Sequence, residues 1–152
     1  TTGSLTAKLS LIAAQLLLEI LPGWLKGELT PQPQDEAEAT HSVPISKQEG
    51  KIDWHLPAID IWRRVRAFHP WPGCYTTWQG KQLKIIEAVP LPGEGALDIG
   101  QVVAMAGTNA AFGVGTGSGI LGVLKLQMEG KRAMSAADFL KGQRQFIGTI
   151  LQ

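Results

Sequence analysis

The first part of the chain has the spacing of apolar side chains that is typical of one strongly apolar helix. Between residues 4 and 21, apolar residues recur every three or four positions, and further leucines widen the stripe. Ser4 is suited to cap this helix and Pro22 to end it. A helix this apolar must be buried, so the pattern indicates the last helix of a domain whose body lies outside this chain. Polar residues interrupt the apolar run 9–21, and we expect it to be too short and too polar to span a bilayer.

A linker and a second helix are expected next. Residues 30–44 combine prolines with an acidic cluster, a composition typical of an extended linker. Residues 53–68 then return to helical spacing, and the prolines within residues 70–72 end this helix. The apolar stripe expected to face inward consists of Ile59, Trp62, Val65 and Phe68.

After Gly73 the hydrophobic period becomes that of strands. Residues 74–78, the turn Gln79-Gly80 and residues 83–89 are typical of a β-hairpin. Ser135 begins a short final helix with a capping-box pattern. Further strands are expected at residues 100–105, 111–114 and 120–128. We therefore predict a mainly β fold, a small Greek-key barrel of the oligonucleotide-binding (OB) type with flanking helices, preceded by a linker and one isolated apolar helix.

Composition and charge narrow the function. The 152 residues are 44% hydrophobic and 18% charged, which is a globular composition. The single cysteine, Cys74, cannot form an internal disulfide, so a cytoplasmic location is expected. The net charge of +1 hides an asymmetry. Residues 1–45 hold two basic and five acidic residues, whereas residues 46–152 hold twelve basic and eight acidic ones. A second part with net charge +4 is compatible with a phosphate-contacting surface without requiring one.

No catalytic or metal site is expected. The glycines at 117, 119 and 122 match a dinucleotide-binding fingerprint, but an alternating, strand-like segment follows them where that motif needs a helix. The three histidines have no carboxylate or cysteine partner at a metal-ligand spacing. Cys74 has no activating neighbour, and we interpret it as a small buried apolar residue. The chain is therefore predicted to have no active site of its own.

Two groups of cations are candidates for nucleic-acid contact. One precedes and includes the second helix, and the other lies before and within the last helix. A solvated, solubilising face is the alternative for both groups. Candidate base-stacking aromatics on the barrel are few (Tyr75, Trp78 and Phe112), so recognition of backbone and shape is favoured over sequence readout. Trp71, between two prolines, is expected to plug the space between helix and barrel.

Three separated motifs carry a resemblance to a known family. They are S-K-Q-E-G-K-I-D-W at residues 46–54, F-H-P-W-P-G at residues 68–73 and G-K-R-A-M-S-A-A-D-F-L-K-G at residues 130–142. In this order they resemble the carboxy-terminal half of the methionyl-tRNA formyltransferases. The resemblance implies three parts: residues 1–29 as the terminal helix of a truncated catalytic domain, residues 30–50 as the linker, and residues 51–152 as a carboxy-terminal, OB-like tRNA-binding domain.

The resemblance also implies a function. The family transfers a formyl group from 10-formyltetrahydrofolate to methionine on initiator tRNA, with an Asn, a His and an Asp that precede the first residue here. This chain would bind and position tRNA without performing the chemistry, and its partners would be initiator methionyl-tRNA and the catalytic domain, with no membrane. By position in the motifs, the residues implied in phosphate contact are Lys47, Lys51, Lys131 and Arg132, followed by Arg63 and Arg66.

Two alternatives remain open at this stage. The chain could be a structural or protein-interaction barrel that forms homo-oligomers through the apolar residues 5–21. It could also be the equivalent domain of another formyltransferase, one that acts on a nucleotide sugar or a folate. The motif at residues 130–142 favours the methionyl-tRNA enzymes over the latter, and salt-sensitive tRNA binding would exclude the former.

Overall fold

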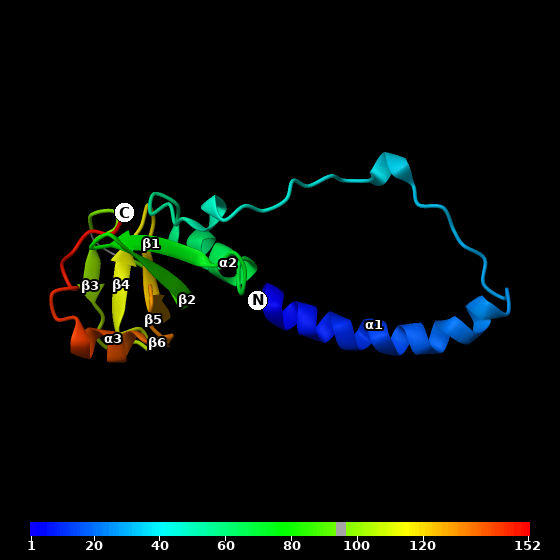
Figure 1. The fold of residues 1–152 in the computed structure, drawn as a ribbon. Coiled ribbons are helices and arrows are strands. Elements are labelled where there is room, and N and C mark those ends of the chain that lie inside the picture. Colours follow the sequence, from blue (N-terminus) through cyan, green and yellow to red (C-terminus); the bar gives the residue numbers. More distant parts are fainter. Residues whose placement is uncertain (94–96) are drawn as a thin grey trace. The chain divides into compact units, whose positions relative to one another are not determined.

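The fold was described from a computed structural model, which covers residues 1–93 and 97–152. The chain divides into two units, one formed by Thr2–Ile45 and the other made chiefly of Ser46–Gln152. Figure 1 shows the helical first unit and the β-rich second unit.

The first unit consists of helix α1 (Thr2–Leu25) and an extended segment with a single 3₁₀ turn, η1 (Glu36–Glu38). The prediction that Ser4 caps the helix and Pro22 ends it is wrong, because both lie inside α1. Pro22 lacks a backbone N–H and sits in the last turn of the helix, where one missing hydrogen bond does not break the remaining ladder. The backbone N–H of Lys26 donates to the carbonyl of Pro22 at 3.3 Å, so the helical path continues past the proline.

No residue of α1 is buried. Its leucines are strongly exposed, and Leu11 and Leu18 are 75% and 74% exposed. The expectation that this segment is too short and too polar to span a bilayer is also wrong by length and composition, because the 24-residue helix has a mean hydropathy of 1.5 over its most apolar stretch. Core helices of soluble domains meet the same criterion of length and composition.

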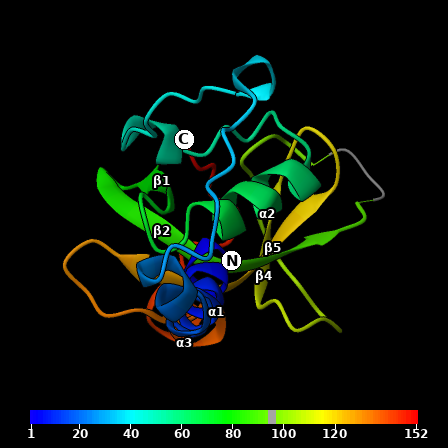
Figure 2. The ribbon, with the colours of Figure 1, turned by 90° about the vertical axis from the view of Figure 1, so that its right-hand side faces the viewer.

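The second unit is built on a six-stranded antiparallel sheet with the strand order β1-β2-β5-β4-β3, and β6 pairs with β5. This confirms the predicted mainly β, barrel-like domain with flanking helices. Helix α2 (Ala58–Ala67) lies over β2 and β5 (Figure 2). The strands are β1 (Cys74–Trp78), β2 (Lys81–Leu91), β3 (Val102–Ala104), β4 (Phe112–Gly115), β5 (Ile120–Met128) and β6 (Met134–Ser135).

The last residues of the chain lie between the two edge strands of this sheet. Val102 of β3 donates its N–H to the carbonyl of Thr149 at 2.8 Å, and Gln101 bridges Ile150. On the other side, Thr77 of β1 donates its N–H to the carbonyl of Gln152 at 3.0 Å. The segment 148–152 therefore pairs with both edges and closes the sheet into a barrel, which covers backbone groups that would otherwise be unpaired.

The hairpin β1–β2 forms where the alternation predicted it. Its turn residues Gln79 and Gly80 have positive φ angles of 49° and 72°, the backbone that matches the twist of two-residue hairpins. Trp78 consequently pairs with Lys81, and Cys74 pairs with Ile85. This turn fixes the register of the whole hairpin, so it determines which side chains point outward.

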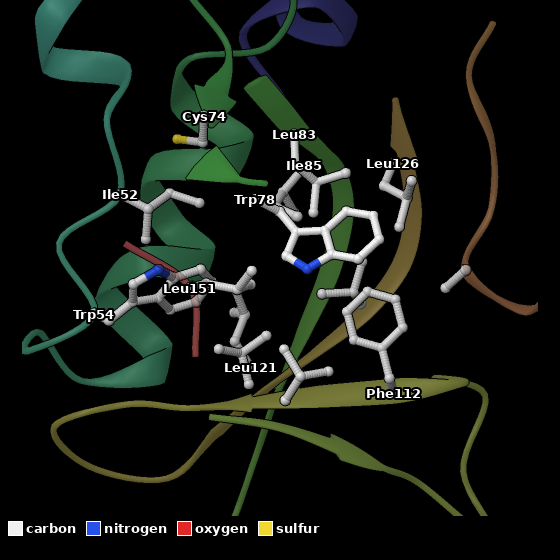
Figure 3. Close-up of a cluster of buried hydrophobic side chains, with 14 of the residues drawn as sticks. Ile52, Trp54, Cys74, Trp78, Leu83, Ile85, Phe112, Leu121, Leu126 and Leu151 are labelled. Carbon is white, nitrogen blue, oxygen red and sulfur yellow. The ribbon is translucent and has the colours of Figure 1, made fainter. Parts of the chain in front are cut away.

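Aromatic rings fill the centre of the barrel. Phe146 contacts Trp78, Phe112 and Phe139 edge to face, with ring centroids 4.9 to 5.0 Å apart. Figure 3 shows Trp78 in the middle of this apolar cluster, close to Ile85 and Phe112. Trp78 and Phe112 are 6% and 0% exposed, so two of the three candidate base-stacking aromatics are buried, in agreement with the weak base readout expected from the sequence. Because alternation put both on the inner face of their strands, burial was the physically favoured outcome.

Helix α2 (Ala58–Ala67) begins five residues later than predicted. Before it, the carboxylate of Asp53 accepts a hydrogen bond from the backbone N–H of His55 at 3.0 Å, and Pro57 caps the helix in an extended conformation. The predicted inward stripe is partly wrong, because Ile61 is buried whereas Ile59 is 38% exposed. The start of α2 is set by a long-range contact in which Ala58 donates its N–H to the carbonyl of Ser118 at 2.9 Å.

Helix α3 (Ala136–Gly142) confirms the predicted cap. The hydroxyl of Ser135 accepts a hydrogen bond from the backbone N–H of Asp138 at 3.1 Å and donates to the carboxylate of Asp138 at 2.7 Å. Lys141 contacts the other carboxylate oxygen of Asp138 at 2.7 Å. These two partners, with Lys141 contributing most, hold the pKa of Asp138 below its ordinary value.

Candidate nucleic-acid interface

The predicted site residues lie in three places on the second unit, and all are exposed. Lys47 and Lys51 flank the 3₁₀ turn η2 (Gln48–Gly50). Arg63 and Arg66 lie on α2. Lys131 and Arg132 lie in the turn between β5 and β6. None of the described residues forms an ion pair with Lys47, Lys51, Lys131 or Arg132, so these four cations are not neutralised within the described structure.

Lys51 is held against the barrel by its neighbours. The backbone N–H of Ile52 donates to the carbonyl of Tyr75 at 2.8 Å, and Lys51 forms a parallel β-bridge with Tyr75. Trp54, 3% exposed, anchors the same segment through a hydrogen bond of 3.2 Å from its indole Nε1–H to the hydroxyl of Thr76. The motif at residues 46–54 therefore positions a lysine at the edge of the sheet.

Lys131 is also fixed by the sheet. Its carbonyl accepts a hydrogen bond of 2.8 Å from the side-chain amide of Gln127, and its N–H donates to the carbonyl of Met128 at 3.0 Å. Gly130, with φ of 72°, makes the tight turn that brings the chain back. The backbone of the turn is thus rigid at the point where Lys131 and Arg132 project.

The arginines of α2 are engaged within the helix. Arg63 forms a hydrogen-bonded i,i+3 ion pair with Asp60 at 2.9 Å. The guanidinium of Arg66 lies 4.5 Å from the centre of the Trp62 ring, a cation–π contact. Both retain their charge, but their side chains already have partners in the helix.

Cys74 and His55 are further groups with titratable side chains on this unit. Burial raises the pKa of the Cys74 thiol from 9.0 to about 11, with a small opposing contribution from Arg64, so the thiol is protonated at neutral pH. His55 pairs with Asp53 at 3.0 Å on the surface. Across residues 1–93 and 97–152, no three histidine, cysteine, aspartate or glutamate side chains come together as metal ligands.

The glycine fingerprint lies in a turn and a strand. Gly117 and Gly119 precede β5, and Gly122 lies within it. Gly117 has no room for a side chain, because a β-carbon there would overlap the backbone carbonyl of His55. Gly117 and Gly119 are therefore explained by close packing against backbone carbonyls, and Gly122 by close packing against neighbouring side chains. The strand that follows confirms the sequence interpretation.

Two surface residues, Trp71 and Lys84, have positions that the sequence did not predict. Trp71 is 55% exposed, so the expectation that it plugs the space between helix and barrel is wrong. A further lysine, Lys84, was not identified because it belongs to no basic cluster in the sequence. The hairpin alternation was the available signal, since it places Lys84 on the outward face opposite Tyr75.

Comparisons with known proteins are consistent with this geometry. Residues 44–144 match the family model described as "Formyl transferase, C-terminal domain". Methionyl-tRNA formyltransferase of Dehalococcoides mccartyi is 46% identical over 153 residues, which cover 99% of this chain and 47% of the relative. The same enzyme of Chloroflexus aurantiacus is 41% identical over 140 residues, covering 92% and 45%, and that of Myxococcus xanthus is 43% identical over 144 residues, covering 95% and 45%.

The fold is also found among solved structures. A variant of HypX from Aquifex aeolicus matches with a TM-score of 0.65 and 21% identity, covering 89% of this chain and 24% of that one. HypX in complex with tetrahydrofolic acid matches with a TM-score of 0.63. The chain therefore spans about half the length of the curated relatives it matches and about a quarter of HypX.

Proposed function

The chain belongs to the family of formyl transferase C-terminal domains, and we propose that it binds and positions tRNA for a methionyl-tRNA formyltransferase. The observation that carries the proposal is the set of exposed cations on rigid backbone, Lys51 at one edge and Lys131 with Arg132 in the β5–β6 turn. Lys47 adds charge beside Lys51, and Arg63 and Arg66 contribute from α2. Cations of this kind contact phosphates without reading sequence.

The proposed division of labour follows the three parts of the chain. Residues 1–29 are the terminal helix of a catalytic domain, residues 30–50 are the linker, and residues 51–152 are the tRNA-binding domain, a barrel of the OB type. The preceding catalytic domain binds 10-formyltetrahydrofolate and transfers the formyl group to methionine on initiator tRNA in the cytoplasm.

The identity of the parent enzyme is supported by the relatives. Those compared above are all named methionyl-tRNA formyltransferase and are 41 to 46% identical to this chain. A formyltransferase acting on a nucleotide sugar or a folate is less well supported, because HypX, at 21% identity, supports the fold alone.

The test is a titration of the chain with initiator tRNA at two salt concentrations beside an unrelated protein of equal charge. We expect binding that exceeds the control and weakens with salt, because each phosphate contact releases a counterion. The variant Lys131→Ala/Arg132→Ala should weaken binding. It should also reduce the slope of log affinity against log salt by the amount expected for the loss of roughly two phosphate contacts. Binding no better than the control would overturn the proposal, and an unchanged slope in the variant would remove both residues from the site.

A second candidate function rests on the exposed leucines of α1, which favour association with another apolar surface. In this alternative, residues 5–21 pair with a second copy of the chain. Sedimentation at increasing concentration tests it, because a monomer at all concentrations would exclude self-association.

A further inference from the structure

One row of side chains starts at the bridge residue Lys51 and crosses the three strands β1, β2 and β5. Lys51 bridges Tyr75, Tyr75 pairs with Lys84 of β2, and Lys84 pairs with Gln127 of β5. Directly paired residues project from the same face of a sheet. The flanking residues of β2, Leu83 and Ile85, are buried, whereas Lys84 is partly exposed, so the row lies on the outer face.

The row joins the two cationic segments that the motifs at residues 46–54 and 130–142 contain. At one end stands Lys51, and at the other Gln127 binds the carbonyl of Lys131 through its amide at 2.8 Å. Neighbouring strands are about 4.8 Å apart, so the backbones of Lys51 and Lys84 are about 10 Å apart. This separation exceeds the Debye length of about 8 Å at physiological salt, so each cation contacts a phosphate largely independently of the others.

Lys84 is held in place by the motif at residues 68–73. A β-carbon at Gly73 would lie 2.7 Å from Cε and 2.9 Å from Nζ of Lys84, so the lysine side chain lies directly over this glycine. Gly73 also has a φ of 77°, a backbone conformation that favours glycine. A lysine already resting on the protein loses less conformational freedom when it binds a ligand.

Gly50 completes the floor of the row. A β-carbon there would overlap the carbonyl of Gly73 and lie 3.3 Å from Cε1 of Tyr75. The motifs at residues 46–54 and 68–73 therefore meet through two glycines beneath Tyr75 and Lys84. Both glycines are buried, and the absence of a side chain at each lets Tyr75 and Lys84 pack directly on backbone.

The charge of Lys84 is uncompensated among the described residues. Lys125, also on this face, forms an ion pair with Glu87 at 3.5 Å, but none of the described carboxylates pairs with Lys84. Glu129, one residue past the end of β5, accepts a hydrogen bond from the backbone N–H of Gln82 at 3.0 Å. At the other end, Glu49 binds the N–H of Ser46 and Asp53 binds that of His55.

We propose that Lys84 is the central phosphate contact of one continuous strip, formed by Lys51, Tyr75, Lys84, Gln127 and Lys131, that follows the sugar–phosphate backbone of tRNA. This proposal rests on the proposed tRNA-binding function. Lysine acts there as a point charge on phosphate oxygens. Gln127 uses its amide nitrogen on Lys131 and keeps its side-chain carbonyl as an acceptor for a ribose hydroxyl.

The test compares Lys84→Gln with Lys81→Gln in tRNA titrations from 0.1 to 1 M salt. Lys81 is the matched control, because it belongs to the same strand and is exposed but lies outside the row. Losing one phosphate contact lowers the slope of log affinity against log salt by about 0.9. If the affinities are equal at 1 M salt, this slope difference gives roughly eightfold weaker binding at 0.1 M. We expect this loss for Lys84→Gln, wild-type behaviour for Lys81→Gln, and recovery of most of the affinity with Lys84→Arg.

Lysine acetylation of the wild-type chain provides a second measurement that needs no variant. With tRNA bound, Lys84 and Lys51 should be protected from acetylation, while Lys81 should be labelled as in the free chain. Equal labelling of Lys84 with and without tRNA would overturn the strip, as would wild-type affinity and slope in Lys84→Gln.

The two proposals fail differently. If the wild-type chain binds tRNA no better than a control protein of equal charge, the proposed tRNA-binding function is wrong, and the proposed strip is wrong as well. If the wild type binds and Lys131→Ala/Arg132→Ala weakens binding but Lys84→Gln does not, the function stands and the strip is wrong.

Discussion

The helix α1 and the barrel use apolar residues in opposite ways. In the barrel, Leu83 is 0% exposed within a cluster of aromatic and aliphatic side chains, whereas Leu11 of α1 is 75% exposed. The barrel therefore contains the partners that its apolar residues require, and α1 does not within the described residues. A strongly apolar pattern with helical spacing is enough to predict a helix. It does not identify the surface that covers the apolar face of that helix, because this surface is formed by tertiary or quaternary packing.

The largest effect should come from making the same substitution in both regions. Leu83→Ala should lower the free energy of unfolding of the barrel by about 2 to 5 kcal/mol, because it leaves a cavity in a closed core. Leu11→Ala should change it by less than about 0.5 kcal/mol. Chemical denaturation followed by tryptophan fluorescence measures both, since Trp54 and Trp78 are buried in the barrel. Equal losses of unfolding free energy in the two variants would show that the helix and the barrel do not differ in how their leucines contribute to stability.

Cys74 provides a pH-dependent test of the closed core. Its pKa is about 11 in the folded chain against an ordinary value of 9.0, so below pH 9 the thiol is protonated in both states. As pH rises through 9 toward 11, the unfolded chain ionises first, and stability should fall by about 2 to 3 kcal/mol. The variant Cys74→Ala should lack this step when unfolding is measured between pH 8 and 11. The same fall in both proteins would assign it to other groups.

A smaller effect is expected at the barrel surface. Ser135→Ala removes the cap of α3 and should cost about 1 kcal/mol, while Ser135→Thr should keep most of the stability. Asp138 has a lowered pKa, so its contribution is present at neutral pH and is lost as pH falls through the folded pKa, below 3.8. Thermal unfolding at pH 7 and pH 3 measures both effects. No difference between Ser135→Ala and wild type at pH 7 would show that the cap is unimportant.

Much of the architecture followed from local patterns. The turn Gln79-Gly80, the alternation on both sides of it and the capping Ser135 predicted a hairpin and a final helix that the structure confirms. These features depend on backbone preferences of a few adjacent residues, so they are readable without the rest of the fold. The predicted site residues came from motif positions, and their contact with tRNA remains a prediction.

The tertiary structure decided what local patterns leave open. Ala58 begins α2 because it bonds to Ser118, sixty residues later in the chain, and the segment 148–152 closes the barrel between two edge strands. Lys84 lies between Lys51 and Gln127 only because three distant segments pair in one register. The amino-acid sequence by itself determined which segments are helical, which alternate and where they turn. Strand pairing over long distances decided which faces are buried and which cations share a surface, because that pairing depends on the packing of the whole core.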